Sequence, residues 1–193
     1  MSLQQRLGIF CCITLIIGTI SACGASSAST PPAGSHPGAT IAVESAMLDT
    51  TDTNLLEVGD RAPDFRYTLA DGSQHRLSDF QGQKVLLNFW ASWCPPCTHE
   101  MPDIQQAATT HAADGLTVLA VNFHEEADVI ESFATEHNLS IPLIANPSGD
   151  ISTRYGVTGL PVSFFINTDG TISYKQIGLL NTDFIELRLE RMQ

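Results

Sequence analysis

The 193-residue chain carries a strong excess of acidic side chains, with 21 Asp and Glu against 9 Lys and Arg and a net charge of −12 at neutral pH. This charge argues against nucleic acid as a partner, because binding to a phosphate backbone depends on clustered Lys and Arg. Hydrophobic residues make up 43% of the chain, close to the globular average, which argues against wholesale disorder. The length allows one domain with extensions.

The chain starts with a short apolar leader over residues 7–20, which has no charged residue and follows a single cation, Arg6. At 14 residues it is shorter than the roughly 20 that a membrane-spanning helix needs, and it fits the core of a secretory signal peptide. The sequence Ile-Ser-Ala-Cys at 20–23 resembles the bacterial lipoprotein signal, in which the cysteine is lipidated and becomes the new N-terminus. We expect a lipoprotein-type signal peptide over 1–22 and a lipid on Cys23; an uncleaved anchor or another cleavage point stays open.

A segment poor in large apolar side chains follows the leader. Residues 24–40 are Gly, Ala, Ser, Thr and Pro apart from His36, a composition that cannot offset the entropy lost on ordering. We expect residues 23–56 to hold the lipidated cysteine and a flexible linker, although 41–54 could also form a short N-terminal element. Such a linker reaches about 30 Å, which places the globular part just outside a cell membrane, on the extracytoplasmic side.

Residues 57–193 form the globular part, in which strand and helix patterns alternate. In chain order we expect two short strands around a Gly turn at 66–69 and 74–77, a strand at 84–90, a helix to about residue 112 that Pro102 should kink, a strand at 116–123, a helix at 128–137, a strand at 141–144, a short helix at 150–155, a hairpin of strands at 162–167 and 171–177, and a closing helix at 181–192. The predicted fold class is α/β, a sandwich with a mixed central sheet flanked by helices and an N-terminal hairpin.

A Cys-x-x-Cys motif lies between a buried strand and a helix. In the sequence Trp-Cys-Pro-Pro-Cys at 93–97, this spacing on a first helical turn brings the sulfurs of Cys94 and Cys97 within reach of a disulfide. The positive end of the helix dipole would stabilise a thiolate on Cys94. Pro95 and Pro96 favour a helix start but withhold their N–H groups from that thiolate. Without the leader cysteines and Cys23, these are the only thiols of the mature chain.

A redox-active pair, a structural zinc site and an inert disulfide are the three interpretations of this motif. Zinc would need four ligands, and the chain has no second Cys pair. An H-E-x-x-H motif that starts at His99 fails, because Asp103 stands where its second His should be. A disulfide that closes so short a loop would add little stability. We therefore favour a redox-active pair that needs no metal and no cofactor beyond its own disulfide.

Four segments resemble the TlpA/ResA branch of the thioredoxin-like proteins. They are Ala-Pro-Asp-Phe at 62–65, VLLNFWASWCPPC at 85–97, Glu-Met-Pro at 100–102 and Gly-Val-Thr-Gly-Leu-Pro at 156–161. The resemblance implies a thioredoxin-like sandwich and a membrane-tethered, extracytoplasmic thiol-disulfide oxidoreductase, most simply one that reduces disulfides in secreted proteins or cytochrome c apoproteins. It also implies protein thiol or disulfide substrates and a membrane thiol-reductant transporter that resupplies electrons.

The resemblance assigns roles to five residues around the motif. Cys94 would be the attacking thiolate that forms a mixed disulfide with the substrate, and Cys97 would resolve it. Pro161 matches the family's cis-proline, and the backbone of Leu160 beside it would pair with the substrate chain like an added strand. Trp93 would shield the sulfur at the rim of the site.

Glu100 is the candidate proton carrier. It stands three residues after Cys97, on nearly the same helix face, where it could take the proton of Cys97 during resolution. The simpler interpretation is an acid stabilised by the helix dipole in a first turn. Many thioredoxins carry a buried Asp six residues before the first cysteine, but here that place holds Asn88, which cannot ionise. This departure favours Glu100 as the proton carrier.

Two other functions stay open. A thiol peroxidase is suggested because peroxiredoxins share the opening at 62–65, but they carry Thr three residues before the peroxidatic cysteine, where this chain has Ala91 before Cys94. A non-catalytic lipoprotein that binds Cu(I) through both thiolates is the other alternative.

An acidic group follows the strand at 116–123 and is the remaining candidate site. It consists of His124, Glu125, Glu126 and Asp128. A metal site is conceivable there, but we expect a solvated helix start.

Overall fold

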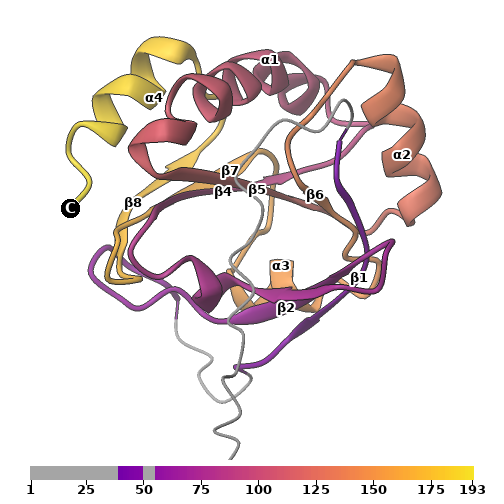
Figure 1. The fold of residues 1–193 in the computed structure, drawn as a ribbon, viewed down its shortest axis with the longest axis horizontal. Coiled ribbons are helices and arrows are strands. Elements are labelled where there is room, and N and C mark those ends of the chain that lie inside the picture. Colours follow the sequence, from indigo (N-terminus) through magenta and orange to yellow (C-terminus); the bar gives the residue numbers. More distant parts are fainter. Residues whose placement is uncertain (1–38, 50–54) are drawn as a thin grey trace, which may run out of the picture.

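The computed structural model describes residues 39–49 and 55–193, which form a sandwich around one eight-stranded sheet (Figure 1). The strands are β1 (Ile41–Met47), β2 (Phe65–Leu69), β3 (Gln74–Arg76), β4 (Lys84–Trp90), β5 (Leu116–Asn122), β6 (Leu143–Ile144), β7 (Val162–Ile166) and β8 (Ile172–Ile177). Their order in the sheet is β3-β2-β1-β6-β5-β4-β7-β8. β1, β6, β5 and β4 are parallel, whereas β2 and β7 pair antiparallel at either side, so the sheet is mixed.

Helices cover both faces of this sheet. They are α1 (Pro95–Thr110), α2 (Ala127–Glu136), α3 (Asp150–Arg154) and α4 (Thr182–Leu189), with two short 3-10 helices, η1 (Leu77–Phe80) and η2 (Ala112–Asp114). α1, α2 and α4 lie on one side of the central strands, and α3 lies on the other (Figure 1). Each face has its own apolar core, and the two cores meet at the sheet.

Alternation along β4 decides which side chains reach the helices. Leu86 and Trp90 are buried against the core under α1, α2 and α4, whereas Leu87 and Phe89 are buried in the opposite core. Successive side chains of a strand point to opposite faces. Asn88 therefore points to the α1 side, although it is polar and fully buried.

The structure confirms the predicted α/β class, the mixed sheet and the N-terminal hairpin of β2 and β3. The alternative left open for residues 41–54 is resolved in part, because 41–47 form β1, which pairs with β2 and β6. α1 runs through Pro102 as one helix, and α4 is shorter than expected. The expected signal peptide, Cys23 and residues 24–38 and 50–54 of the expected linker lie outside the described residues.

No helix within residues 39–49 and 55–193 has the length and apolar character needed to cross a membrane.

Candidate active site

The two cysteines of the motif form a disulfide at the start of α1. Cys94 and Cys97 are bonded at 2.04 Å, with their Cα atoms 5.3 Å apart. Cys94 is the N-cap of the helix and its sulfur accepts a hydrogen bond from the Cys97 N–H at 3.3 Å. Pro95 and Pro96 occupy the first helical positions, where a missing N–H costs nothing and the fixed φ favours the helix. A thiolate on Cys94 would therefore lie at the positive end of the α1 dipole.

Both sulfurs are shielded, but to different extents. The side chain of Cys97 is fully buried, and Cys94 is 4% exposed. Trp93, just before them, is 63% exposed, whereas Trp90 is buried in the core. Cys94 is therefore the more exposed of the two cysteines, and Trp93 is free to contact a partner rather than being part of the core.

Pro161 lies at the same end of the sheet as the disulfide. The Leu160–Pro161 peptide bond is cis, as the resemblance implies. Val162, the next residue, pairs with Phe89 of β4, so Pro161 is level with the end of β4 from which the chain continues to Cys94. Leu160 is half-buried and packs against both cores. The predicted substrate-binding residues and the cysteines thus share one edge of the sheet.

The segment after β8 closes this edge. The N–H of Gly178 donates to the carbonyl of Pro161 at 2.9 Å. Its neighbours Ile177 and Leu179 are 73% and 42% exposed. Together with Trp93, these apolar side chains give the surface beside the site a character that suits apolar parts of a polypeptide.

Glu100 is buried one turn beyond Cys97 and is held by two donors. Its carboxylate accepts from the Asn88 side-chain amide at 2.8 Å and from the Leu180 N–H at 2.7 Å. The pKa of Glu100 is raised to about 7 mainly because the group is buried; the hydrogen bonds from Leu180 and Asn88 partly oppose this rise, and the negative charge of Asp103 adds a smaller increase. A carboxyl with this pKa can gain or lose a proton near neutral pH.

Asn88 extends this network across the sheet. Its amide donates to Glu100 and, at 2.9 Å, to the hydroxyl of Ser163 on β7. All three side chains are fully buried. The sequence indicated only that Asn88 could not ionise. Its contact with Glu100 follows from the alternation of side chains along β4, which directs both Asn88 and Trp90 toward α1. Nothing in the sequence indicated a role for Leu180, because it binds Glu100 through its backbone N–H and not through its side chain.

Glu125 departs from the expectation of a solvated helix start. Its half-buried carboxylate accepts from the Ser92 N–H at 2.7 Å, from the Ser92 hydroxyl and from the Asn122 side chain at 2.7 Å. The helix α2 begins only at Ala127, so Glu125 belongs to the turn that follows β5. The neighbouring acids Glu126 and Asp128 are exposed, as expected. Within the described part of the chain, no three His, Cys, Asp or Glu side chains are grouped as metal ligands.

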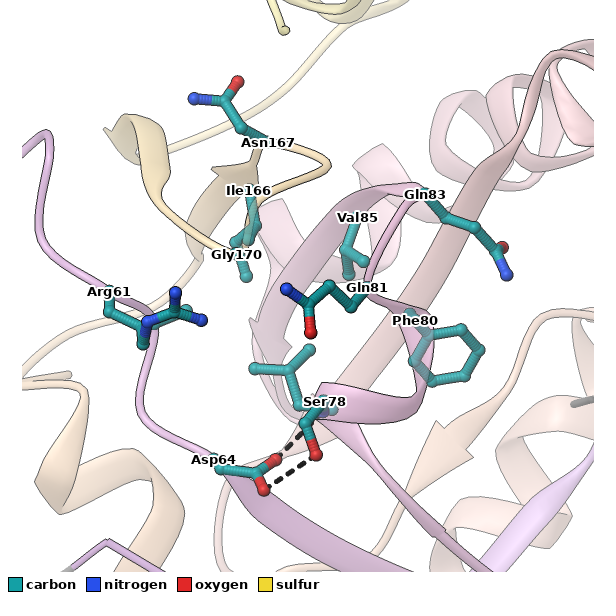
Figure 2. Close-up of a pocket in the computed structure, with 12 residues that line it drawn as sticks. Arg61, Asp64, Ser78, Phe80, Gln81, Gln83, Val85, Ile166, Asn167 and Gly170 are labelled. Carbon is teal, nitrogen blue, oxygen red and sulfur yellow. Dashed lines mark hydrogen bonds between the residues drawn. The ribbon is translucent and has the colours of Figure 1, made fainter. Parts of the chain in front are cut away.

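A cavity of about 120 Å³ lies away from the cysteines (Figure 2). Its lining includes Val85 and Ile166, which are near the start of β4 and at the end of β7, whereas Cys94 follows the far end of β4. Asp64 on its rim accepts hydrogen bonds from the backbone and hydroxyl of Ser78 at 3.0 and 2.9 Å. None of the described residues that line the cavity is a cysteine, so it is separate from the disulfide site.

Comparison with known proteins gives the same picture as the site. The chain matches the AhpC/TSA family over residues 58–175. It is 35% identical over 143 residues to the thiol-disulfide oxidoreductase ResA of Geobacillus kaustophilus, a match that covers 74% of this chain and 82% of that protein.

Solved structures agree with this match. The fold is similar to that of a protein from Chlorobium tepidum described as thiol:disulfide interchange protein DsbE, with a TM-score of 0.65 and 33% identity over 70% of this chain and 96% of that one. It is also similar to the exposed lipoprotein thioredoxin Etrx1 of Streptococcus pneumoniae, with a TM-score of 0.57 and 32% identity over 67% and 99% of the two chains. The chain belongs to the AhpC/TSA family of thioredoxin-like proteins and is a thiol-disulfide oxidoreductase.

Proposed function

We propose that the protein is an extracytoplasmic reductant, held at the membrane by a lipid on Cys23, that reduces disulfides in secreted proteins or in cytochrome c apoproteins. The observation that carries the mechanism is the buried Glu100, whose pKa is raised to about 7, one helical turn beyond the buried Cys97. A dithiol that reduces another disulfide has to lose the proton of its second thiol inside the protein. Glu100 is the acceptor for that proton.

In the first step Cys94 attacks the client. Its thiolate displaces one sulfur of the client disulfide, which forms a mixed disulfide and releases the first client thiolate. The thiolate needs no added base, because the α1 dipole and the Cys97 N–H already stabilise it. Cys94 is also the more exposed of the two cysteines, which favours it as the attacking one.

In the second step Cys97 resolves the mixed disulfide. Its thiol gives a proton to the Glu100 carboxylate, and the resulting thiolate attacks the sulfur of Cys94. The Cys94–Cys97 disulfide forms again and the second client thiolate leaves, so that two electrons have passed to the client. The proton on Glu100 then returns to the client thiolate or to water, which a pKa near 7 allows.

The small number of N–H donors to the Cys94 sulfur favours reduction of the client rather than its oxidation. Strong oxidants of this fold stabilise the reduced form through a very low thiol pKa. Here the first two residues of α1 are Pro95 and Pro96, which have no N–H, and the donor on the Cys94 sulfur is the Cys97 N–H. Fewer donors stabilise the thiolate less, and the pair holds its electrons less tightly.

The client chain lies along the edge that holds Pro161. The backbone of Leu160 pairs with an extended client segment, while Trp93 and the exposed apolar side chains beside Pro161 contact its apolar residues. The protein is reduced again by a membrane thiol-reductant transporter. Support for the tether comes from the structurally similar Etrx1, which is described as an exposed lipoprotein.

The midpoint potential of the Cys94–Cys97 pair, measured in graded thiol buffers, tests the direction. We expect a value near that of thioredoxin, about −270 mV, and a value near −120 mV would make the protein an oxidant. Disulfide reduction must also disappear in Cys94→Ser, whereas Cys97→Ser must accumulate the mixed disulfide. Rapid peroxide consumption would favour the peroxidase alternative, and stoichiometric Cu(I) binding without turnover would favour the metal-binding one. Mass spectrometry of the N-terminal peptide tests the lipid on Cys23.

A further inference from the structure

Glu125 makes a compact set of contacts beside the cysteines. Its carboxylate receives the Ser92 N–H and hydroxyl on one side and the Asn122 amide on the other. Its own N–H donates to the Asn122 side-chain oxygen at 3.0 Å, so that Asn122 binds both the backbone and the side chain of Glu125. These two bonds to Asn122 restrict the rotation of the Glu125 side chain and orient its carboxylate toward Ser92.

The two ends of this contact belong to different parts of the fold. Asn122 is fully buried at the end of β5 and pairs with Trp90 of β4, so it is fixed by the sheet. Ser92 lies in the short segment between β4 and α1, two residues before Cys94. Glu125 is 33 residues from Ser92 in the sequence and ties the cysteine-bearing segment to the neighbouring strand.

We propose that Glu125 is a positioning residue for the Cys94 thiolate, which fixes the segment at Ser92 and places a negative charge near the reactive sulfur. The inference rests on the proposed function and deepens it. When the disulfide is reduced, the covalent link between Cys94 and Cys97 is gone, and the contact at Ser92 remains to hold Cys94 at the helix end. The charge of Glu125 opposes the positive end of α1, which keeps the thiolate less stable and the pair more reducing.

Glu125→Gln tests both effects in the reduced protein, with Glu126→Gln as the matched control. The two substitutions remove the same charge from adjacent residues, but Glu126 is exposed and makes no side-chain capping bond to α2. The acid Glu100 is unchanged in both variants. The thiol pKa of Cys94 is followed by thiolate absorbance, and the Ser92 amide by hydrogen exchange. Neither measurement needs a client, so a failed client assay leaves this test intact.

In Glu125→Gln we expect the Cys94 thiol pKa to fall by about half a unit to one unit, because the negative charge that binds Ser92, two residues before Cys94, has been removed. The Ser92 amide should exchange about tenfold faster, because its acceptor changes from a charged carboxylate to a neutral amide oxygen and the hydrogen bond weakens. Glu126→Gln should lower the thiol pKa by no more than about 0.2 units. Equal pKa changes in the two variants, or unchanged exchange at Ser92, would overturn the proposal.

Glu125→Asp keeps the test decisive if Glu125→Gln does not fold. Aspartate retains the charge but is one methylene shorter, so this variant weakens the contact with Ser92 while the negative charge stays. We expect faster exchange at Ser92 with less change in the Cys94 thiol pKa than glutamine causes. Exchange at Ser92 as slow as in the unchanged protein would refute the positioning role.

Discussion

The substitution Glu100→Gln should make the free energy of unfolding of the oxidised protein depend less on pH. In the folded protein burial raises the pKa of Glu100 from 4.5 to about 7, whereas in the unfolded chain the side chain regains its ordinary value. Between these two values the folded state binds more protons than the unfolded state, so the free energy of unfolding falls as the pH rises. This loss is complete above about pH 7 and corresponds to about 3 kcal/mol.

Urea unfolding, followed by tryptophan fluorescence at about pH 5 and about pH 8, measures this contribution. Glutamine cannot ionise, so the free energy of unfolding of Glu100→Gln relative to the unchanged protein should rise by about 2.5 kcal/mol between the two conditions, most of the full effect. Glutamine keeps one acceptor oxygen, and any cost from altered bonds to Asn88 or Leu180 is the same at both pH values. Glu126→Gln serves as control, because Glu126 is exposed and should show no comparable change.

An equal stability difference at both pH values would refute the reasoning. Glu100 would then be ionised over the whole range, and its pKa would be too low for it to hold the Cys97 proton near neutral pH. The proposed resolution step would need another base.

Two further substitutions test one contact of Glu100 and one tight turn of the fold. Asn88→Asp places a second carboxyl where the Asn88 amide lies 2.8 Å from the Glu100 carboxylate. Because two carboxylates this close cannot both ionise, the mixed disulfide should resolve more slowly at neutral pH, and the pH profile of the resolution rate should shift. An unchanged profile in stopped-flow measurements would count against the contact. Gly149→Ala should lower the free energy of unfolding, measured in urea, by more than Gly115→Ala does. Both glycines have a positive φ, which costs an alanine about 1–2 kcal/mol, but only at Gly149 would the new Cβ also meet the His124 ring. Equal losses would mean that the His124 ring moves aside.

Local patterns predicted the parts of the molecule that depend on neighbours in the sequence. The apolar run of β4 indicated a buried strand, and the spacing from Cys97 to Glu100 placed both on one helix face. Both are determined within a few residues of chain, where strand alternation and helical periodicity operate.

Contacts between distant segments could not be predicted in the same way. Residues 41–47 hold two strand formers, Ile41 and Val43, but Glu44, Ser45 and two alanines interrupt the apolar pattern. They form β1 because β2 and β6 offer hydrogen bonds on both sides. Glu125 resembles any acid at a helix start until the fold brings Ser92 to it. The amide that binds Glu100 comes from Leu180, 80 residues away.

That amide has a consequence for how related proteins are compared. The family match ends at residue 175, and Leu180 lies after it, in the connection from β8 to α4. Two relatives can therefore share every residue of the Cys-x-x-Cys motif and its glutamate and still differ in the acidity of that glutamate, because the C-terminal segment supplies one of its two hydrogen-bond donors. Swapping β8–α4 between such relatives would change the proton affinity of the glutamate without altering the Cys-x-x-Cys motif or the glutamate itself.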